Sequence, residues 1–380
     1  MDLSFTDDQR MIRDMVREFA QKELAPKAAD RDKSGEPPLE EIRKLAELGL
    51  MGMRVPAEYG GSEAGTLALA LALMEIAQGD AAAAVITSVT NMVAEAIYRF
   101  GDEEQRRAFL PKVLTGDFPV GAFALTEPQA GSDARNLKTR AETDGDAFVL
   151  NGEKTFITSA PISSVFIVMA KTGAADRSAP ISSFLVEKDT PGLVVGKPEK
   201  KMGLHGSPTC TVSFDNCRIP RSNRLGREGD GFKVAMMALD GGRIGVSSQS
   251  IGIARAALDF AVGYAKERQA FGAPIAKLQA IQWKIADMAM ELDAAQLLVW
   301  RAACLKDAGR PFTREASMAK LYATEAANRA CKEAVQILGG YGYVSDYPVE
   351  RHMRDCKVTT LYEGTSEIQR LVIARHVIGE

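Results

Sequence analysis

The chain has little cysteine and histidine and no long uninterrupted apolar run. Its 5 cysteines, at positions 210, 217, 304, 331 and 356, form no CxxC pair, and its 3 histidines lie far apart. An odd, scattered set of thiols argues against a disulfide framework. So few separated histidines argue against a zinc or non-haem iron centre. The longest apolar runs, such as 67–74, are too short to cross a membrane.

The sequence also lacks an excess of positive charge and the common nucleotide-binding fingerprints. Lys and Arg total 47 against 50 Asp and Glu, which excludes a general nucleic-acid coat. There is no GxGxxG after a strand, no GxxxxGK[ST] and no GxSxG. Any nucleotide cofactor must therefore bind by another geometry.

The N-terminus, MDLSFTDDQR, has early acids and no apolar core, so it does not look like a targeting segment. We therefore expect a protein without membrane insertion. A bacterial source would make it cytoplasmic, and a mature mitochondrial matrix chain remains the alternative.

Three compositional zones divide the chain and predict an α+β fold. Residues 1–118 read as helices, with Ser4 and Thr6 as N-cap candidates and a break at Pro37-Pro38. Residues 119–222 carry short β-branched runs between turn pairs such as 144–145 and 151–152, typical of an antiparallel sandwich or barrel. Residues 223–380 return to long helices nearly free of proline, which indicates an antiparallel bundle.

Two segments suggest a binding or catalytic site. The first, LTEPQAGSD at 125–133, follows the expected start of the β-zone. Its glycine and hydroxyls suit a pyrophosphate or a ring carbonyl, although a plain surface turn reads the same way. The second, TLYEGTSE at 360–367, places Glu363 before a final helix for which Thr365 or Ser366 is the N-cap. Glu363 is either a solvated loop carboxylate or a desolvated general base with a raised pKa.

Three further segments are ambiguous when taken singly. LDGGRI at 239–244 is expected to open a bundle helix, where Arg243 would be exposed or would hold an anion. QILGGYG at 336–342 is either a helix C-cap or a stretch of exposed backbone against which a flat or phosphorylated ligand binds. RQAFG at 268–272 offers an arginine fork suited to phosphate.

Together these motifs resemble the acyl-CoA dehydrogenase family, most of all its short-chain (butyryl-CoA) branch. The resemblance runs from the FTDDQ opening to the EIQRLVIAR close and includes LTEPxAGSD, NGEKxFIT, RxAFG, QILGGYGY and YEGTSEIQR. It implies an N-terminal helical domain (1–118), a central antiparallel β-barrel (119–222) and a C-terminal four-helix bundle (223–380). It also implies FAD bound between domains and a homotetramer.

The resemblance carries site residues onto this chain. The flavin and pyrophosphate region would involve Phe123, Leu125, Thr126, Gly131 and Ser132, with Phe156 and Thr158 against the isoalloxazine and Thr365, Ser366 and Glu367 completing the site. A neighbouring subunit's FAD would be met by Arg268, Gln279, Gln336, Gly339 and Gly340. The acyl-CoA would contact Ser132, Asp240, Gly241, Gly242, Arg243 and Gly364.

The implied reaction is α,β-dehydrogenation of a short-chain acyl-CoA to a trans-2-enoyl-CoA. Glu363 would take the α-proton, flavin N5 the β-hydride, and electron-transferring flavoprotein the electrons. One branch of the family keeps its base immediately before the bundle arginine. That position is Gly242 here, so Glu363 must act, and a straight short chain is favoured.

The chain departs from the family pattern at several positions and leaves rival functions open. Phe156 stands where tryptophan is usual, Ser159 where asparagine is common, and His205 begins what is usually Arg-Gly-Ser. The segment around 88–101 looks one residue short. The rivals are a branched, cyclic or otherwise specialised acyl-CoA substrate, an acyl-CoA oxidase using O2, and a helical binding protein without chemistry.

Overall fold

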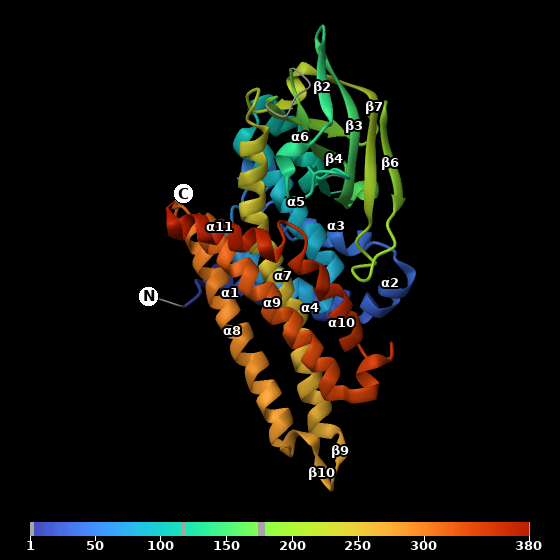
Figure 1. Cartoon of the computed structure of the whole chain (residues 1–380), viewed down its shortest axis with the longest axis vertical. Coiled ribbons are helices and arrows are strands. Elements are labelled where there is room, and N and C mark those ends of the chain that lie inside the picture. Colours follow the sequence, from blue (N-terminus) through green and yellow to red (C-terminus); the bar gives the residue numbers. More distant parts are fainter. Residues whose placement is uncertain (1–3, 116–118, 174–178, 380) are drawn as a thin grey trace.

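The computed structural model describes residues 4–115, 119–173 and 179–379. Figure 1 shows a sheet above a set of long helices, with the shorter N-terminal helices packed where the two meet. The N-terminal helices are α1 (Asp7–Phe19), α2 (Ala28–Ser34), α3 (Leu39–Glu47), α4 (Gly65–Gly79), α5 (Ala81–Phe100) and α6 (Glu103–Leu114). The order helical, β, helical is the predicted one, whereas the boundaries at 118/119 and 222/223 stay predictions.

Local signals explain where the N-terminal helices begin and end. The Thr6 side chain accepts from the backbone N–H of Gln9 and closes a capping box, as its N-cap prediction required. Gly35, in a left-handed conformation (φ 73°), ends α2, and the Pro37-Pro38 pair separates it from α3. Asp80 caps α5 through the N–H groups of the first turn.

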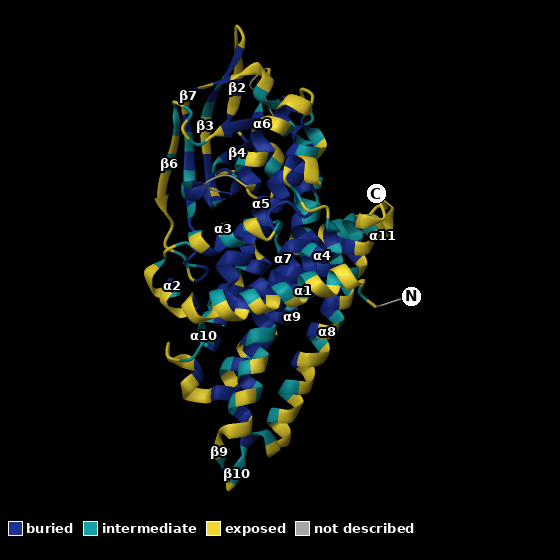
Figure 2. Cartoon of the chain, turned by 180° about the vertical axis from the view of Figure 1, so that it is seen from behind, coloured by how far each residue is buried: buried dark blue, intermediate teal, exposed yellow. Residues whose placement is uncertain are grey.

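Helix α5 is long and apolar enough to cross a membrane, but 94% of its apolar window is buried inside the protein. It packs against α4, α6, α7 and β1, and Figure 2 shows buried residues gathered where α4, α5 and α7 meet. It is therefore a core helix. Scanning for unbroken apolar runs missed it because Thr87, Ser88 and Asn91 interrupt the run.

The central sheet has the hydrogen-bonded order β6-β7-β3-β2-β4-β5-β8, and β1 is added beside β4. The β-branched runs of the middle zone, at 148–150, 165–168, 184–186 and 211–214, all lie in strands. The sheet is antiparallel except for the parallel pairs β1–β4 and β2–β4. Among the described residues β6 and β8 do not pair, so the expected barrel is open there by its hydrogen bonds. The strands are β1 (Gly121–Ala124), β2 (Arg140–Asp144), β3 (Ala147–Thr158), β4 (Val165–Lys171), β5 (Ile181–Glu187), β6 (Leu193–Pro198), β7 (Thr209–Pro220) and β8 (Arg224–Leu225).

One of the two predicted β-turns was wrong. The Asp144-Gly145 pair connects β2 to β3 as expected, with Gly145 at φ 59°. The Asn151-Gly152 pair instead lies inside β3, where the pairing with β7 shifts register. A β-carbon on Gly152 would lie 2.6 Å from the Thr139 hydroxyl, so this glycine serves a bulge with close approach and not a hairpin.

The C-terminal zone is a bundle of long helices. Helices α7, α8 and α9 pack on one another, and α10 and α11 pack against α9. The 239–244 segment, expected to open a helix, lies inside the 37-residue α7, and Arg243 is buried. That prediction was wrong because glycines need not interrupt a helix whose neighbours pack closely. The elements are α7 (Gly231–Glu267), the short strands β9 (Gln269–Ala270) and β10 (Ala273–Pro274), α8 (Gln279–Asp307), α9 (Thr313–Leu338), α10 (Val349–Lys357) and α11 (Ser366–Ile378).

Candidate active site

A cleft of about 600 Å³ opens between the sheet and the end of the C-terminal helices. The structure brings several predicted site residues together there, although they lie more than 200 residues apart in the sequence. The predicted residues that line this cleft are Thr126, Gly131, Ser132, Phe156, Thr158, Glu363, Gly364 and Thr365.

Phe156 and Gly131 give this cleft the character of a binding site for a flat ligand. The Phe156 side chain is 65% exposed although it is a large apolar ring, and its backbone is left-handed (φ 56°). Such a conformation costs about 1–3 kcal/mol in a residue with a β-carbon and is typical of functional sites. A methyl group added to Gly131 would meet no heavy atom within 4 Å, so the backbone there is open to the cleft.

A buried ion pair holds the loop at one side of the cleft. Lys154 of β3 is fully buried, and its Nζ donates to the Leu125 carbonyl at 3.0 Å and to Glu127 Oε1 at 2.7 Å. The Glu127 carboxylate also accepts from the backbone N–H groups of Lys138 (2.5 Å) and Thr139 (2.9 Å). The 125–132 loop is thus fixed at its base while Gly131 and Ser132 remain at the cleft.

Glu363 is the carboxylate of the cleft, and its surroundings favour the protonated form. Burial raises the pKa of Glu363 to about 7, against the opposing positive charges of Lys320 and Arg243. Its Oε2 is buried without a hydrogen-bond partner among the described residues. A β-carbon on Gly242 would lie 1.8 Å from that oxygen, so with any larger residue there the carboxylate would have to leave its present position. Of the two interpretations of Glu363, the desolvated carboxylate fits the structure.

Arg243 of α7 acts on Glu363 and forms an ion pair with Asp240 of the same helix. Arg243 Nη1 donates to Asp240 Oδ1 at 2.7 Å and to Ser317 Oγ at 3.1 Å. Asp240 Oδ2 accepts from the Thr313 hydroxyl at 2.6 Å. Arg243 is therefore ion-paired inside the bundle, although its charge still acts on Glu363.

Five other predicted residues lie away from this cleft. Arg268, Gly339 and Gly340 line a second cleft of about 840 Å³ at the far end of α7 and α9. Gln279 and Gln336 are exposed on α8 and α9. The structure therefore does not bring this group to Glu363 within one chain, which is the arrangement expected of residues that serve a neighbouring subunit.

Four further predicted residues do not line the cleft, namely Phe123, Leu125, Ser366 and Glu367, whereas the neighbouring Thr365 does. Phe123 is partly buried in β1, and Leu125 is buried just beyond it. Thr365 is the N-cap of α11, as predicted for that residue or Ser366. The Ser366 hydroxyl bonds to Glu325 at 2.6 Å, and Glu367 is exposed.

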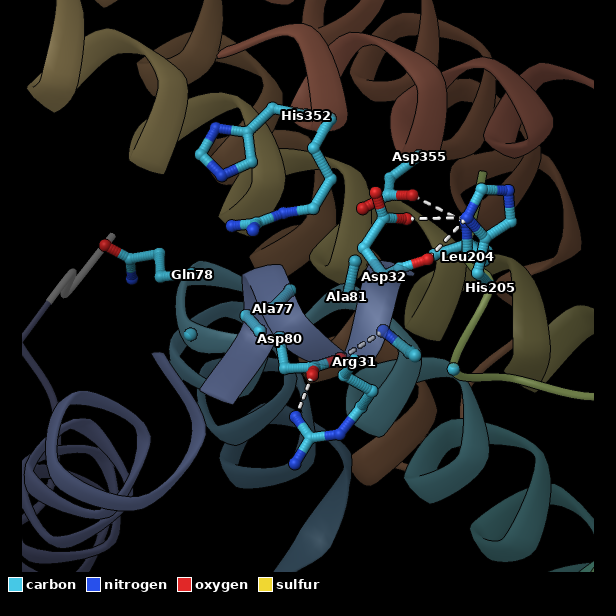
Figure 3. A pocket seen from close by; sticks show the side chains of 15 residues that line it. Arg31, Asp32, Ala77, Gln78, Asp80, Ala81, Leu204, His205, His352 and Asp355 are labelled. Carbon is cyan, nitrogen blue, oxygen red and sulfur yellow. Dashed lines mark hydrogen bonds and ion pairs between the residues drawn. The ribbon is translucent and has the colours of Figure 1, made fainter. Parts of the chain in front are cut away.

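Sequence reasoning missed one wall of the cleft, residues 199–204, which carry no motif. A polar cluster behind this wall fixes it (Figure 3). His205 Nδ1 lies 2.8 Å from Asp32 Oδ1, and the Leu204 N–H donates to Asp355 at 2.5 Å. Arg354 donates to the other oxygen of Asp32 at 2.6 Å. These contacts tie the wall to α2 and α10, so all three zones of the chain meet here.

Comparison with known proteins decides the family. Sequence models of three acyl-CoA dehydrogenase domains match the chain in order: the N-terminal domain at residues 6–117, the middle domain at 122–217 and the C-terminal domain at 229–378. The chain belongs to the acyl-CoA dehydrogenase family. It is thus a flavin-dependent oxidoreductase with the helical, sheet and helical domains of that family.

Similar proteins in this family include short-chain enzymes. The chain is 50% identical over 373 residues to the human mitochondrial short-chain specific acyl-CoA dehydrogenase, covering 98% of this chain and 90% of that protein. The structure of butyryl-CoA dehydrogenase from Megasphaera elsdenii matches with a TM-score of 0.96 at 44% identity, covering both chains fully. A chain in the structure of the electron transferring flavoprotein of Acidaminococcus fermentans matches with a TM-score of 0.97 at 45% identity, again over both chains.

Proposed function

We propose that this enzyme dehydrogenates a short, straight-chain acyl-CoA to the trans-2-enoyl-CoA with FAD as its cofactor. The observation that carries the proposal is the Glu363 carboxylate at the cleft, whose Oε2 is buried without a hydrogen-bond partner among the described residues, in the space left by Gly242. Gly242 has no side chain to act as a base, so proton abstraction falls to Glu363.

The state of Glu363 suits removal of an α-proton near neutral pH. A base works best when its pKa lies near the working pH, and burial raises the pKa of Glu363 to about 7. As the proton leaves, negative charge develops on the thioester oxygen, which then needs a hydrogen-bond donor. The backbone N–H of Glu363 donates no hydrogen bond to any described residue and is therefore available for this task.

The residues at the cleft fit FAD. Phe156 offers an exposed ring for a flat ligand, and Gly131 with Ser132 offers open backbone and a hydroxyl, so these residues with Thr126 and Thr158 would hold the cofactor. FAD, when bound, supplies the acceptor for the β-hydride. The chain's own residues orient the acyl group, exclude water and hold the proton on Glu363.

A small cavity on α7 supports a short acyl group. Its volume is about 20 Å³, close to the space of one water molecule, and it lies between α4, α5 and α7 beside Gly242. Gly241, Gly245 and Ser88 line it, as do Lys306 and Glu95, which form a buried ion pair (2.7 Å). Long acyl chains would have to displace this pair, which is costly in a buried site.

The second cleft and the exposed apolar residues near it support an assembly of several subunits, which we propose is a homotetramer. Phe271, which is 94% exposed, lies three residues after Arg268, and Tyr343, which is 87% exposed, lies four residues after Gly339. Exposed aromatic residues of this kind mark contact surfaces. We further propose electron-transferring flavoprotein as the acceptor, supported by the matching chain from Acidaminococcus fermentans. The cytoplasmic location stays a prediction.

An anaerobic titration of the purified holoenzyme with butyryl-CoA tests the proposal. We expect the oxidised-flavin absorption band to bleach at near-stoichiometric substrate. A yellow protein that does not bleach with butyryl-CoA but bleaches with a branched or cyclic thioester would contradict the substrate. A protein that binds no FAD on reconstitution would contradict the function itself. Stoichiometric peroxide on turnover under air would replace the dehydrogenase with an oxidase.

A further inference from the structure

Lys320 is a positively charged residue of α9 that lies entirely inside the protein. Its side chain is 0% exposed, and its Nζ donates to the carbonyl oxygen of Gly364 at 2.8 Å. Among the described residues, no carboxylate oxygen lies within 4.0 Å of this ammonium group. Burying a charge without a directly paired ion is costly, so the position calls for an explanation beyond packing.

The carbonyl that Lys320 holds belongs to the turn that presents Glu363. Glu363 (φ 52°) and Gly364 (φ 91°) are both left-handed, a conformation that is strained for Glu363. Gln369 also holds this turn, since its Nε2 donates to the Glu363 carbonyl at 3.2 Å and to the Gly364 carbonyl at 2.9 Å. Two side chains therefore hold the strained 363–364 turn: Lys320, which is charged, and Gln369, which is neutral.

Two positive charges, Lys320 and Arg243, act on the base, and among the described residues only that of Lys320 has no carboxylate oxygen within 4.0 Å. Arg243, which faces Glu363 from α7, is paired with Asp240 at 2.7 Å. Glu325 on α9 and Glu367 on α11 also act on Lys320, but neither forms an ion pair with it. Of the carboxylates that act on Lys320, Glu363 has the largest effect.

The other titratable groups near this turn face Tyr362, next to the base. They are Asp355 and Cys356 of α10, and the Tyr362 hydroxyl donates to Gln249. Burial raises the pKa of Tyr362 well above its usual value, so this phenol stays neutral over the working range. Burial also lowers the pKa of Lys320 to about 8, with Glu363 as the main opposing charge. Near pH 7 Lys320 is therefore mainly the ammonium ion.

We propose that Lys320 is the positioning residue of the catalytic base: it anchors the 363–364 turn, and its charge stabilises the carboxylate form of Glu363. This inference rests on the proposed role of Glu363. It predicts two separable effects, since anchoring controls the geometry of the carboxylate and charge controls the pH at which the carboxylate forms.

The test compares neutral variants of Lys320 with a variant of the neutral anchor. Lys320→Gln and Lys320→Met remove the charge, Gln369→Met removes only hydrogen bonds to the same turn, and Thr324→Val is the matched control. Thr324 is fully buried one turn further along α9, and its hydroxyl donates to the backbone carbonyl of Lys320 at 2.8 Å, not to the lysine side chain. The holoenzymes are assayed with butyryl-CoA for kcat and kcat/KM from pH 5.5 to 9.5.

We expect both Lys320 variants to move the rising limb of kcat/KM upward by at least about one pH unit. Activity would fall about fivefold at pH 7 and recover toward pH 9, since a base must lose its proton to act. Gln369→Met should lower kcat without moving the limb, and Thr324→Val should leave both unchanged.

A wild-type limb in folded Lys320 variants would overturn the inference. So would a pair of Lys320 variants that fail to fold while Thr324→Val folds, because that result would assign Lys320 a purely structural role. Failure of the underlying function is recognised separately, because Glu363→Gln would then keep its turnover.

Discussion

Replacing Glu363 by glutamine should abolish turnover and also stabilise the folded enzyme at high pH. Burial raises the pKa of Glu363 from its ordinary 4.5 to about 7, so the folded state binds this proton more tightly than the unfolded chain does. Stability must then fall as the pH rises from about 4.5 through 7. At about 1.36 kcal/mol for each pH unit, the wild type loses about 3 kcal/mol that the glutamine variant keeps.

For a chain of 380 residues, about 3 kcal/mol corresponds to about 4 °C in Tm. Scanning fluorimetry of both flavin-loaded proteins at pH 5, 7 and 9 measures it. The two Tm values should nearly coincide at pH 5, and the glutamine variant should melt higher at pH 9. Glu104→Gln, which changes an exposed carboxylate on α6, controls for total charge. A Tm difference that is the same at pH 5 and pH 9 would refute the burial argument.

Three further predictions concern activity and assembly. The rising limb of kcat/KM should have its midpoint near pH 7, and a midpoint near pH 4.5 would show that Glu363 is solvated during catalysis. Gly242→Ala should lower kcat/KM by about 100-fold, because its β-carbon would displace the carboxylate, whereas Gly263→Ala on the same helix, with no atom within 4 Å, should not. Arg268→Ala should weaken FAD retention on gel filtration, and a full flavin content would contradict its placement.

The sequence predicted those features that depend on local chemistry. The cap at Thr6, the strand runs and the turn at 144–145 were confirmed because each depends on a few neighbouring residues. The 151–152 pair was misread because a glycine at a bulge and a glycine at a hairpin look alike without the partner strand. Arg243 was expected near a helix start because nothing local shows that α7 begins twelve residues earlier, at Gly231.

The sequence predicted the main residues of the site but not the residues that hold them in place. Motifs led to Glu363 and Gly131, but Lys320 belongs to no motif. A signal was nevertheless present: Lys320 occurs among Ala316, Ala319 and Ala323, the buried stripe of α9. A lysine within a buried stripe is rarely tolerated without a function, and this pattern would have identified it. The state of Glu363 required the fold, because its burial depends on Gly242, 121 positions earlier in the chain.

Helix α5 has a consequence for how the protein is made. The elements that pack on α5 include α7, which begins at Gly231, 131 residues after α5 ends at Phe100. At about 5–20 residues per second, the ribosome needs roughly 7–26 s to reach the start of α7. Throughout this interval the nascent chain carries a helix with the length and hydropathy of a bilayer span. Until α7 has been synthesised, the apolar surface of α5 that packs on α7 therefore lacks its native partner.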